Sequence, residues 1–237
     1  MITALDILQA TAYINDVDIY TVGALVESFK VSGTAISNTA YQGVNSTDFN
    51  VLQTTRGMRV ITLNLFYKGT TRRELALKKA KIDGMIGTGK IDLKLPDGFH
   101  YSAYLTAPGE EQMLGVEGNE MIALCTYTLQ GIRHDDLVSF SVASGATFKC
   151  ESLIPETDVR LICTTSQARA SLTIGTVTIT GVSANDVLTV DGIRKRILQN
   201  GAPCAGNMSF IKFPKLVPGD NTISCPETLT VEYYPTY

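Results

Sequence analysis

The sequence predicts a mainly β protein of two domains, with one α-helix in the first. Apolar residues make up 44% of the 237 residues and charged residues only 18%, and threonine, isoleucine and valine are plentiful, as in folded, strand-rich proteins. Only one segment has a convincing helical pattern. The length suits two ordinary domains, and we place them at residues 1–133 and 134–237.

The first domain is expected to open with two short strands between Ala12 and Val31, each bounded by turn signals. Residues 32–57 are long, polar and rich in Ser, Thr, Asn and Gly. We interpret them as a loop or extended arm, because a connection longer than about 12 to 15 residues is usually functional or mobile. Residues 58–69 then alternate, and the residues expected to share the buried face of a strand are Ile61, Leu63, Leu65 and Tyr67.

The helix is predicted over residues 70–86. Thr71 and Glu74 fit a capping box, in which each side chain satisfies a free backbone N–H group of the first turn. Leu75, Ile82 and Ile86, with Ala76 nearby, form a stripe that can be buried, and Gly87 and Gly89 end the helix. Off the stripe lie five cations: Arg72, Arg73, Lys78, Lys79 and Lys81. They form either a nucleic-acid patch or, as we favour, a solvated or subunit-facing side.

Strands are expected at residues 90–95, 99–106 and 120–132, with a turn at Pro96–Gly98. The second domain consists of short strands at a spacing of roughly 8 to 12 residues, which is typical of a sandwich or barrel. Asp191-Gly192 predicts a two-residue hairpin turn. We expect no helix in the last hundred residues.

No catalytic motif, metal site or cofactor fingerprint stands out, so we predict no catalytic, metal-binding or cofactor-binding residues. The five cysteines form no C-x-x-C pair and are interpreted as small buried apolar residues. His134 beside Asp135 and Asp136 could form a metal or acid–base cluster, and Glu110 with Glu111 could form a carboxylate pair. We favour solvated charges in both places.

The net charge of −3 argues against a surface that grips nucleic acid by neutralising phosphates. The sequence contains no run of about 18 apolar residues, and its start lacks the pattern of a signal peptide, so we expect synthesis in the cytosol and no membrane insertion. Near the end, Tyr233 and Tyr234 could stack on a sugar or contact a partner. Aromatic residues in a last strand more often serve sheet packing or an interface.

Two stretches resemble one known family. Residues 60–106 contain a strand, a G-T-x-R-x-E-L helix start, an L-x-L-P-D-G turn and a Y-x-x-x-L strand. Residues 186–237 contain a hairpin, an F-P-x-L-x-P-G-x-N-T-I turn and a final V-x-Y-x-P-x-Y strand. In this order the motifs resemble the distal tail proteins (Dit) of phages with long, non-contractile tails. Residues between Arg133 and Arg160 do not match a motif of that family.

The resemblance implies an N-terminal β-sandwich-like ring domain with one α-helix, related to tail tube proteins, and a C-terminal galectin-like β-sandwich. It implies a virion structural protein of a phage or prophage tail tip or baseplate: a hexameric ring, assembled in the bacterial cytoplasm, that lets DNA pass without specific binding. Implied partners are the tail tube protein, the tape measure, the tail-associated fibre protein and a receptor-binding protein. The alternative is a carbohydrate-binding adhesion module for host attachment.

Within such a ring, the resemblance makes three cations of the helix candidates for a subunit contact: Arg72, Arg73 and Lys79. Tyr41 and Phe49 are the aromatic candidates in the arm. A long arm suits this role because it can lie on a neighbouring copy and become ordered there.

Overall fold

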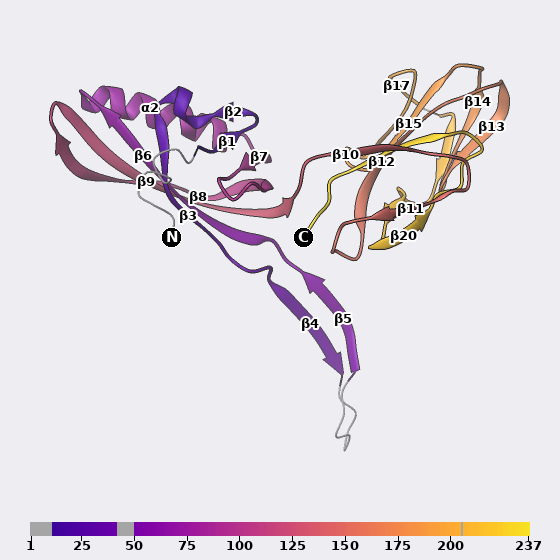
Figure 1. Cartoon of the computed structure of the whole chain (residues 1–237), viewed down its shortest axis with the longest axis horizontal. Helices are drawn as coiled ribbons and strands as arrows, with labels where there is room; N and C mark the ends of the chain where they lie inside the picture. The colour runs from indigo at the N-terminus through magenta and orange to yellow at the C-terminus, as the bar shows by residue number, and fades with distance from the viewer. Residues whose placement is uncertain (1–10, 42–49, 205) are drawn as a thin grey trace. The chain divides into compact units, whose positions relative to one another are not determined.

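A computed structural model of the chain describes residues 11–41, 50–204 and 206–237, without the side chains of residues 50 and 52–56. By its contacts, the chain divides into two compact units, Met1–Arg133 and His134–Tyr237. Both units are built from antiparallel strands, and the described residues contain a single α-helix (Figure 1). The prediction of a mainly β fold with one α-helix is confirmed. That helix is not long and apolar enough to cross a membrane.

The N-terminal unit is organised around one seven-stranded sheet in the order β2-β1-β7-β8-β9-β6-β3. Its strands are β1 (Tyr13–Ile14), β2 (Val17–Asp18), β3 (Ala24–Val31), β6 (Arg59–Gly69), β7 (Ile91–Lys94), β8 (His100–Glu117) and β9 (Glu120–His134). A 3-10 helix, η1 (Ile19–Val22), joins β2 to β3, where the sequence predicted only a turn between two strands. The long strands β6 and β9 pair without interruption from Arg59↔Gly131 to Gly69↔Met121.

Helix α2 (Arg72–Ile86) covers one face of this sheet (Figure 1). Its buried side chains are Leu75, Ile82 and Ile86, as the stripe predicted, whereas Ala76 is exposed. They pack on the alternate residues of β6 that the sequence assigned to the buried face. Period 3.6 in the helix meets period 2 in the strand, and the core of the unit lies between them.

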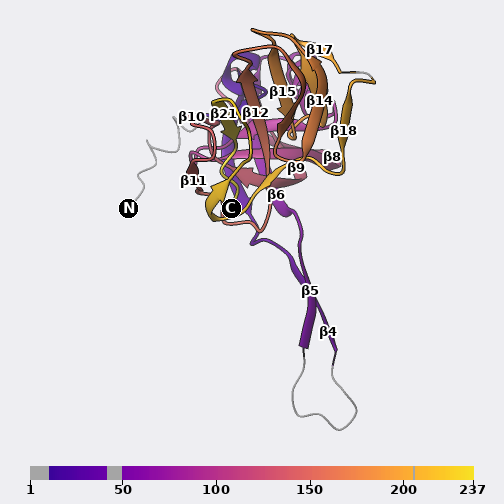
Figure 2. The ribbon, with the colours of Figure 1, turned by 90° about the vertical axis from the view of Figure 1, so that its right-hand side faces the viewer.

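The segment predicted as a loop or arm is a ribbon of two paired strands, β4 (Ile36–Tyr41) and β5 (Asn50–Arg56). The ribbon forms a sheet of its own, separate from the seven-stranded sheet (Figures 1 and 2). The prediction of a loop is therefore wrong for most of this segment. Cross-strand backbone pairing provides its regular structure even though its composition is that of a loop.

The C-terminal unit contains three sheets. Its strands are β10 (Val138–Val142), β11 (Thr147–Cys150), β12 (Thr157–Thr164), β13 (Arg169–Ile174), β14 (Val177–Val182), β15 (Val187–Asp191), β16 (Arg196–Gln199), β17 (Ala202–Pro203), β18 (Met208–Phe210), β19 (Lys215–Leu216), β20 (Gly219–Thr222) and β21 (Leu229–Tyr233). The sheets have the orders β10-β21-β12-β15-β16-β17, with β19 also on β12, then β11-β20, and β13-β14-β18. No helix occurs among the described residues after Arg133, as predicted.

Each unit has its own hydrophobic core. The five cysteines are free and buried, which confirms their interpretation as small apolar residues. Four of them lie in the core of the C-terminal unit and one in that of the N-terminal unit: Cys150, Cys163, Cys204, Cys225 and Cys125.

The hairpin at Asp191-Gly192 is longer than predicted. Asp191 pairs with Arg196, so residues 192–195 form the connection. The buried Asp191 carboxylate accepts hydrogen bonds from the Arg194 N–H group and from Arg196 Nε, which holds the wider turn. A Cβ on Gly192 would meet the Val159 carbonyl oxygen at 2.7 Å, so this glycine allows close approach to β12.

Candidate assembly and contact surfaces

The β4–β5 ribbon presents its side chains to solvent. Every residue of β4 is exposed, and three large apolar side chains on the ribbon are exposed by half or more: Ile36, Tyr41 and Val51. No residue of the ribbon belongs to the core of the N-terminal unit. An isolated two-stranded ribbon is only marginally stable in water, so these strands have the features of a segment that binds another molecule.

The base of the ribbon is fixed to the sheet. The Ser32 N–H group donates to the Val60 carbonyl at 2.8 Å, the Val60 N–H group donates to Ser32 Oγ at 2.8 Å, and the Gly57 N–H group donates to the Ala35 carbonyl at 2.7 Å. The ribbon is thus anchored where it leaves the sheet. Tyr41 lies in the last described pair, opposite Asn50, and Phe49 lies outside the described residues.

At the start of helix α2, Arg72 and Arg73 are exposed. Thr71 is the N-cap, and its hydroxyl accepts from the Glu74 N–H group at 3.2 Å. The Glu74 carboxylate departs from a standard capping box, because it accepts from the N–H group of Thr70, one residue before the cap. Cations are unfavourable at this end of a helix, where the dipole is positive, so the two arginines weaken the helix in the free chain.

The carboxylate of Glu74 is the anion of this first turn. Its ion pair with Lys78 at 2.8 Å and its hydrogen bonds from Thr70 lower the pKa of Glu74 to about 2. Lys78 also donates to the Lys68 carbonyl at 2.6 Å, so it is tied to the end of β6.

Lys79 differs from the two arginines, because its ammonium is held within the unit. It pairs with Asp83 Oδ2 at 2.6 Å, and Asp83 Oδ1 accepts from the Tyr127 hydroxyl at 2.8 Å. Burial raises the pKa of Tyr127, so its hydroxyl remains a donor. The helix cations predicted as one surface therefore divide into exposed arginines and a lysine engaged inside the fold.

The face of the sheet away from helix α2 carries a row of uncharged polar side chains. Thr126 Oγ1 donates to Asn64 Oδ1 at 2.7 Å, and Asn64 Nδ2 donates to Ser28 Oγ at 2.8 Å. Further along, the Tyr104 hydroxyl donates to Gln130 Oε1 at 2.9 Å. These bonds cross neighbouring strands and fix the side chains in the plane of the sheet. The central part of this face is polar without dense positive charge.

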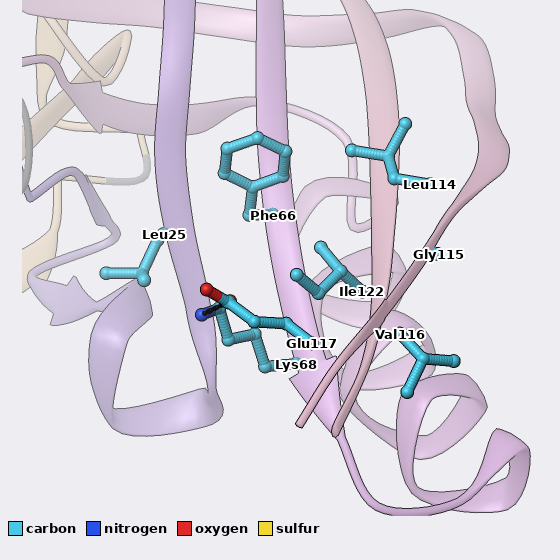
Figure 3. A pocket seen from close by; sticks show the side chains of 8 residues that line it. All are labelled: Leu25, Phe66, Lys68, Leu114, Gly115, Val116, Glu117 and Ile122. Carbon is cyan, nitrogen blue, oxygen red and sulfur yellow. Dashed lines mark hydrogen bonds and ion pairs between the residues drawn. The ribbon is translucent and has the colours of Figure 1, made fainter. Parts of the chain in front are cut away.

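One end of this face has an apolar groove of about 400 Å³ (Figure 3). Its lining comes from β3, β6, β8 and β9: Leu25, Phe66, Lys68, Leu114, Gly115, Val116, Glu117 and Ile122. The ion pair between Lys68 and Glu117, at 2.8 Å, lies in its wall and is visible in Figure 3. This pair raises the pKa of Lys68 and lowers the pKa of Glu117.

The two tyrosines considered for a glycan differ in access. Tyr233 is 1% exposed, packs edge-to-face on Phe140, and its hydroxyl accepts from the Glu151 N–H group at 3.1 Å. Its ring is part of the core and cannot stack on a sugar at the surface, so the assignment of Tyr233 as a contact residue is wrong. Tyr234 is 37% exposed, with its ring 5.0 Å from that of His134.

The structure assembles no metal cluster from the residues considered for chemistry. Within residues 11–41, 50–204 and 206–237, no group of three or more His, Cys, Asp or Glu side chains is placed to hold an ion. His134 Nδ1 lies 2.9 Å from the Asp135 carbonyl oxygen, and the Tyr237 hydroxyl donates to Asp135 Oδ2 at 3.4 Å. Glu110 and Glu111 lie on the projecting part of β8.

Sequence reasoning missed two apolar residues of the ribbon, Ile36 and Val51. The short alternation in residues 36–41 was the available signal, but the polar composition around it pointed to a loop. The apolar groove left no signal in the sequence, because strands far apart along the chain form it.

No protein-family model matches this sequence, and no curated protein matches it. Solved structures do. The Dit protein (gp 19.1) of phage SPP1, described as a paradigm of the hub adsorption apparatus in phages that infect Gram-positive bacteria, aligns with a TM-score of 0.72 and 11% identity, covering 96% of this chain and 99% of that chain. A chain of the phage p2 baseplate, activated with Sr, aligns with a TM-score of 0.59 and 9% identity over 95% of this chain and 97% of that one. The p2 baseplate activated with Ca gives 0.59 and 8% over 96% and 98%. This chain therefore has the fold of a phage Dit protein.

Proposed function

We propose that this chain is the hub of a phage or prophage tail tip, a structural protein that forms a homohexameric ring between the tail tube and the fibre or receptor-binding apparatus. The observation that carries the proposal is the shared fold, which extends over 96% of this chain and 99% of SPP1 Dit. The N-terminal unit would form the ring, and the C-terminal unit would be the peripheral galectin-like domain. Fold alone does not define a function, so the surfaces must supply the further argument.

The exposed ribbon supports assembly. A head-to-tail ring needs one surface that reaches a neighbour and a different surface that receives it. The ribbon leaves Ile36, Tyr41 and Val51 in water, so binding to a neighbouring copy would remove their apolar area from solvent. The exposed arginines at the start of helix α2 would find carboxylates on that copy, which would offset their unfavourable position in the free chain.

The polar face of the sheet supports a channel for DNA. A surface that DNA passes without binding should avoid clustered Lys and Arg, because phosphate neutralisation creates affinity. The cross-strand network of Ser28, Asn64 and Thr126 is uncharged. We propose that this face of the sheet, away from helix α2, lines the lumen of the ring.

The proposed location is the tip of the virion tail, after synthesis in the bacterial cytoplasm. The tail tube protein and the tape measure would bind on one side of the ring and the tail-associated fibre protein on the other, with a receptor-binding protein at the periphery. The chain would act without a catalytic step of its own.

Native mass spectrometry and negative-stain electron microscopy test this proposal. The expected result is a six-fold ring with an opening wide enough for duplex DNA, formed by the chain alone at high concentration or with the tube and fibre proteins. Monomers alone, even with both partners present, would contradict it. The alternative, a carbohydrate-binding module, retains only Tyr234 of its two candidate residues, because Tyr233 is buried.

A further inference from the structure

The C-terminal unit has an open sheet edge at β18. Among the described strands, β18 pairs only with β14. The neighbouring residues continue the pairing, because the Thr180 N–H group donates to the Asn207 carbonyl at 2.8 Å and Thr176 Oγ1 donates to the Lys212 carbonyl at 2.7 Å. Residues 207–212 therefore run beside β14 as the last strand of this sheet (Figure 2). The opposite side of this strand is available for another strand.

This edge exposes apolar side chains. Ile211 is 96% exposed, Phe210 is 41% exposed and Met208 is 38% exposed. The ring of Phe210 lies 5.1 Å from that of Phe213, so the apolar surface continues toward β19. Single exposed apolar residues are common, but three within four residues on an open edge are a hazard for a protein that stays free.

Positive charge surrounds the same edge. The sequence from Gly192 to Gly219 contains five of the eight Lys and Arg residues of residues 134–237 and no Asp or Glu: Arg194, Lys195, Arg196, Lys212 and Lys215. Lys195 joins the two features, because its Nζ lies 5.6 Å from the centre of the Phe213 ring.

Two carboxylates outside this stretch compensate part of the charge. Lys195 and Lys215 share Asp158 Oδ1, at 2.7 and 2.5 Å, and Arg196 pairs with the buried Asp191. Arg194 and Lys212 are exposed. Five cations around two carboxylates leave an excess of positive charge on a domain whose other charges are mainly acidic.

We propose that the β18 edge binds an acidic, extended segment of a partner protein. The segment would add a strand beside residues 207–212, place an apolar side chain against Phe210 and Ile211, and present its carboxylates to Arg194 and Lys212. Main-chain hydrogen bonds supply affinity in this mode, side chains supply specificity, and opposite charges speed the encounter. The inference uses only the C-terminal unit, so it does not depend on ring formation.

Protection against aggregation and binding of a polyanion would each leave half of this edge without a role. Lysine on an edge strand can serve to prevent aggregation, but an edge protected in this way would not leave Ile211 almost fully in water. A phosphate-rich polymer would use the cations, but it would make no use of the exposed apolar residues. An acidic strand with apolar side chains uses both.

A synthetic peptide tests the proposal on the full chain. The probe is an acetylated and amidated nonapeptide that alternates Glu with Val and Ile, and its binding is measured by fluorescence anisotropy and by NMR chemical-shift mapping. We expect saturable binding, with shifts confined to residues 207–212 and their neighbours. Ile211→Ser and the double variant Arg194→Glu/Lys212→Glu should each weaken binding by about tenfold. The matched control Lys90→Glu/Lys149→Glu makes the same change in net charge at two other exposed lysines and should bind as the unmodified chain does.

The peptide backbone and a simple polyanion separate the outcomes. The same peptide methylated on alternate backbone nitrogens lacks the donors that a strand needs, and we expect it to bind at least about tenfold more weakly. Failure of the unmethylated peptide to bind would overturn the proposal. Equal binding of the methylated peptide or of inorganic polyphosphate, with no effect of Ile211→Ser, would also overturn it and leave only an anion-binding patch. All substituted residues are exposed, so unchanged thermal unfolding of each variant checks that folding is intact.

Discussion

The hydroxyl oxygens of Tyr67 and Tyr127 lie 3.0 Å apart beneath helix α2, with both side chains buried. Because Tyr127 donates to Asp83, the Tyr67 hydroxyl is the donor in the bond between the tyrosines. A directed chain of hydrogen bonds thus runs from β6 through β9 to the helix. The helix is held by this polar network as well as by its apolar stripe.

Tyr127→Phe should destabilise the N-terminal unit by about 1–3 kcal/mol, because it leaves the Tyr67 hydroxyl and Asp83 Oδ1 each without this partner. Urea denaturation of the full chain, followed through the transition of the N-terminal unit, measures the change. Tyr20→Phe, at a residue that is 65% exposed, is the control and should change stability by less than about 0.5 kcal/mol. Equal effects of the two variants would show that the network contributes nothing.

Two glycines of the same unit should respond to alanine in opposite directions. A Cβ on Gly109 would lie 2.5 Å from the Tyr127 ring and 2.7 Å from Cys125 Sγ, so Gly109→Ala should cost about 1–3 kcal/mol through overpacking. Gly84 is in helix α2, and its Cβ would meet nothing within 4 Å. Gly84→Ala should therefore stabilise the unit by about 0.5–1 kcal/mol, since glycine is the poorer helix former. Denaturant midpoints of both variants decide this, and shifts of the same sign would contradict it.

Acid should weaken the start of helix α2 within a defined pH range. The pKa of Glu74 falls from the ordinary 4.5 to about 2 in the folded chain, mainly through Lys78 and then Thr70. Its stabilising contribution is therefore present above about pH 4.5 and is lost as the pH falls toward 2. The difference in stability between the unmodified chain and Glu74→Gln should shrink across this range. Glu120→Gln, at an exposed turn residue, is the comparison, and a constant difference for Glu74→Gln would disprove the linkage.

The elements that the sequence predicted correctly depend on local periodicity. The buried face of β6 and the stripe of Leu75, Ile82 and Ile86 follow from side chains that repeat every second residue or every turn. The hairpin at Asp191-Gly192 depends on more distant residues. There, the Asp191 carboxylate and the Val159 carbonyl determine the turn, and neither interaction can be inferred from a dipeptide.

The surfaces were harder to predict than the core. Lys79 and Arg73 are equivalent cations on a helical pattern, and only the position of Asp83 above Tyr127 distinguishes them. Ile211 belongs to an ordinary strand-like stretch of sequence, and its exposure depends on which strand lies next to it. Exposure is a property of the assembled fold, so sequence patterns leave it undetermined.

If the ribbon binds a neighbouring copy, Tyr41→Ser should raise the concentration needed for ring assembly by about tenfold, because a buried aromatic residue is a typical interface anchor. Native mass spectrometry over a concentration series measures this. Tyr20→Ser is a matched control, since Tyr20 is 65% exposed and Tyr41 is 60% exposed in the same unit. Indistinguishable assembly of the two variants would remove Tyr41 from the interface.

The helix cations allow a test in which assembly and monomer stability change in opposite directions. Arg72→Glu/Arg73→Glu should weaken the ring by removing the proposed subunit contact. It should also stabilise the monomer by about 0.3–1 kcal/mol per residue, because carboxylates are favourable at a helix N-terminus. Lys79→Gln should instead destabilise the monomer by about 1 kcal/mol, since it breaks the ion pair to Asp83. Thermal unfolding and native mass spectrometry of both variants give four results. A ring that survives the arginine reversal would make this helix a structural element only, and loss of monomer stability in that variant would contradict the electrostatic argument.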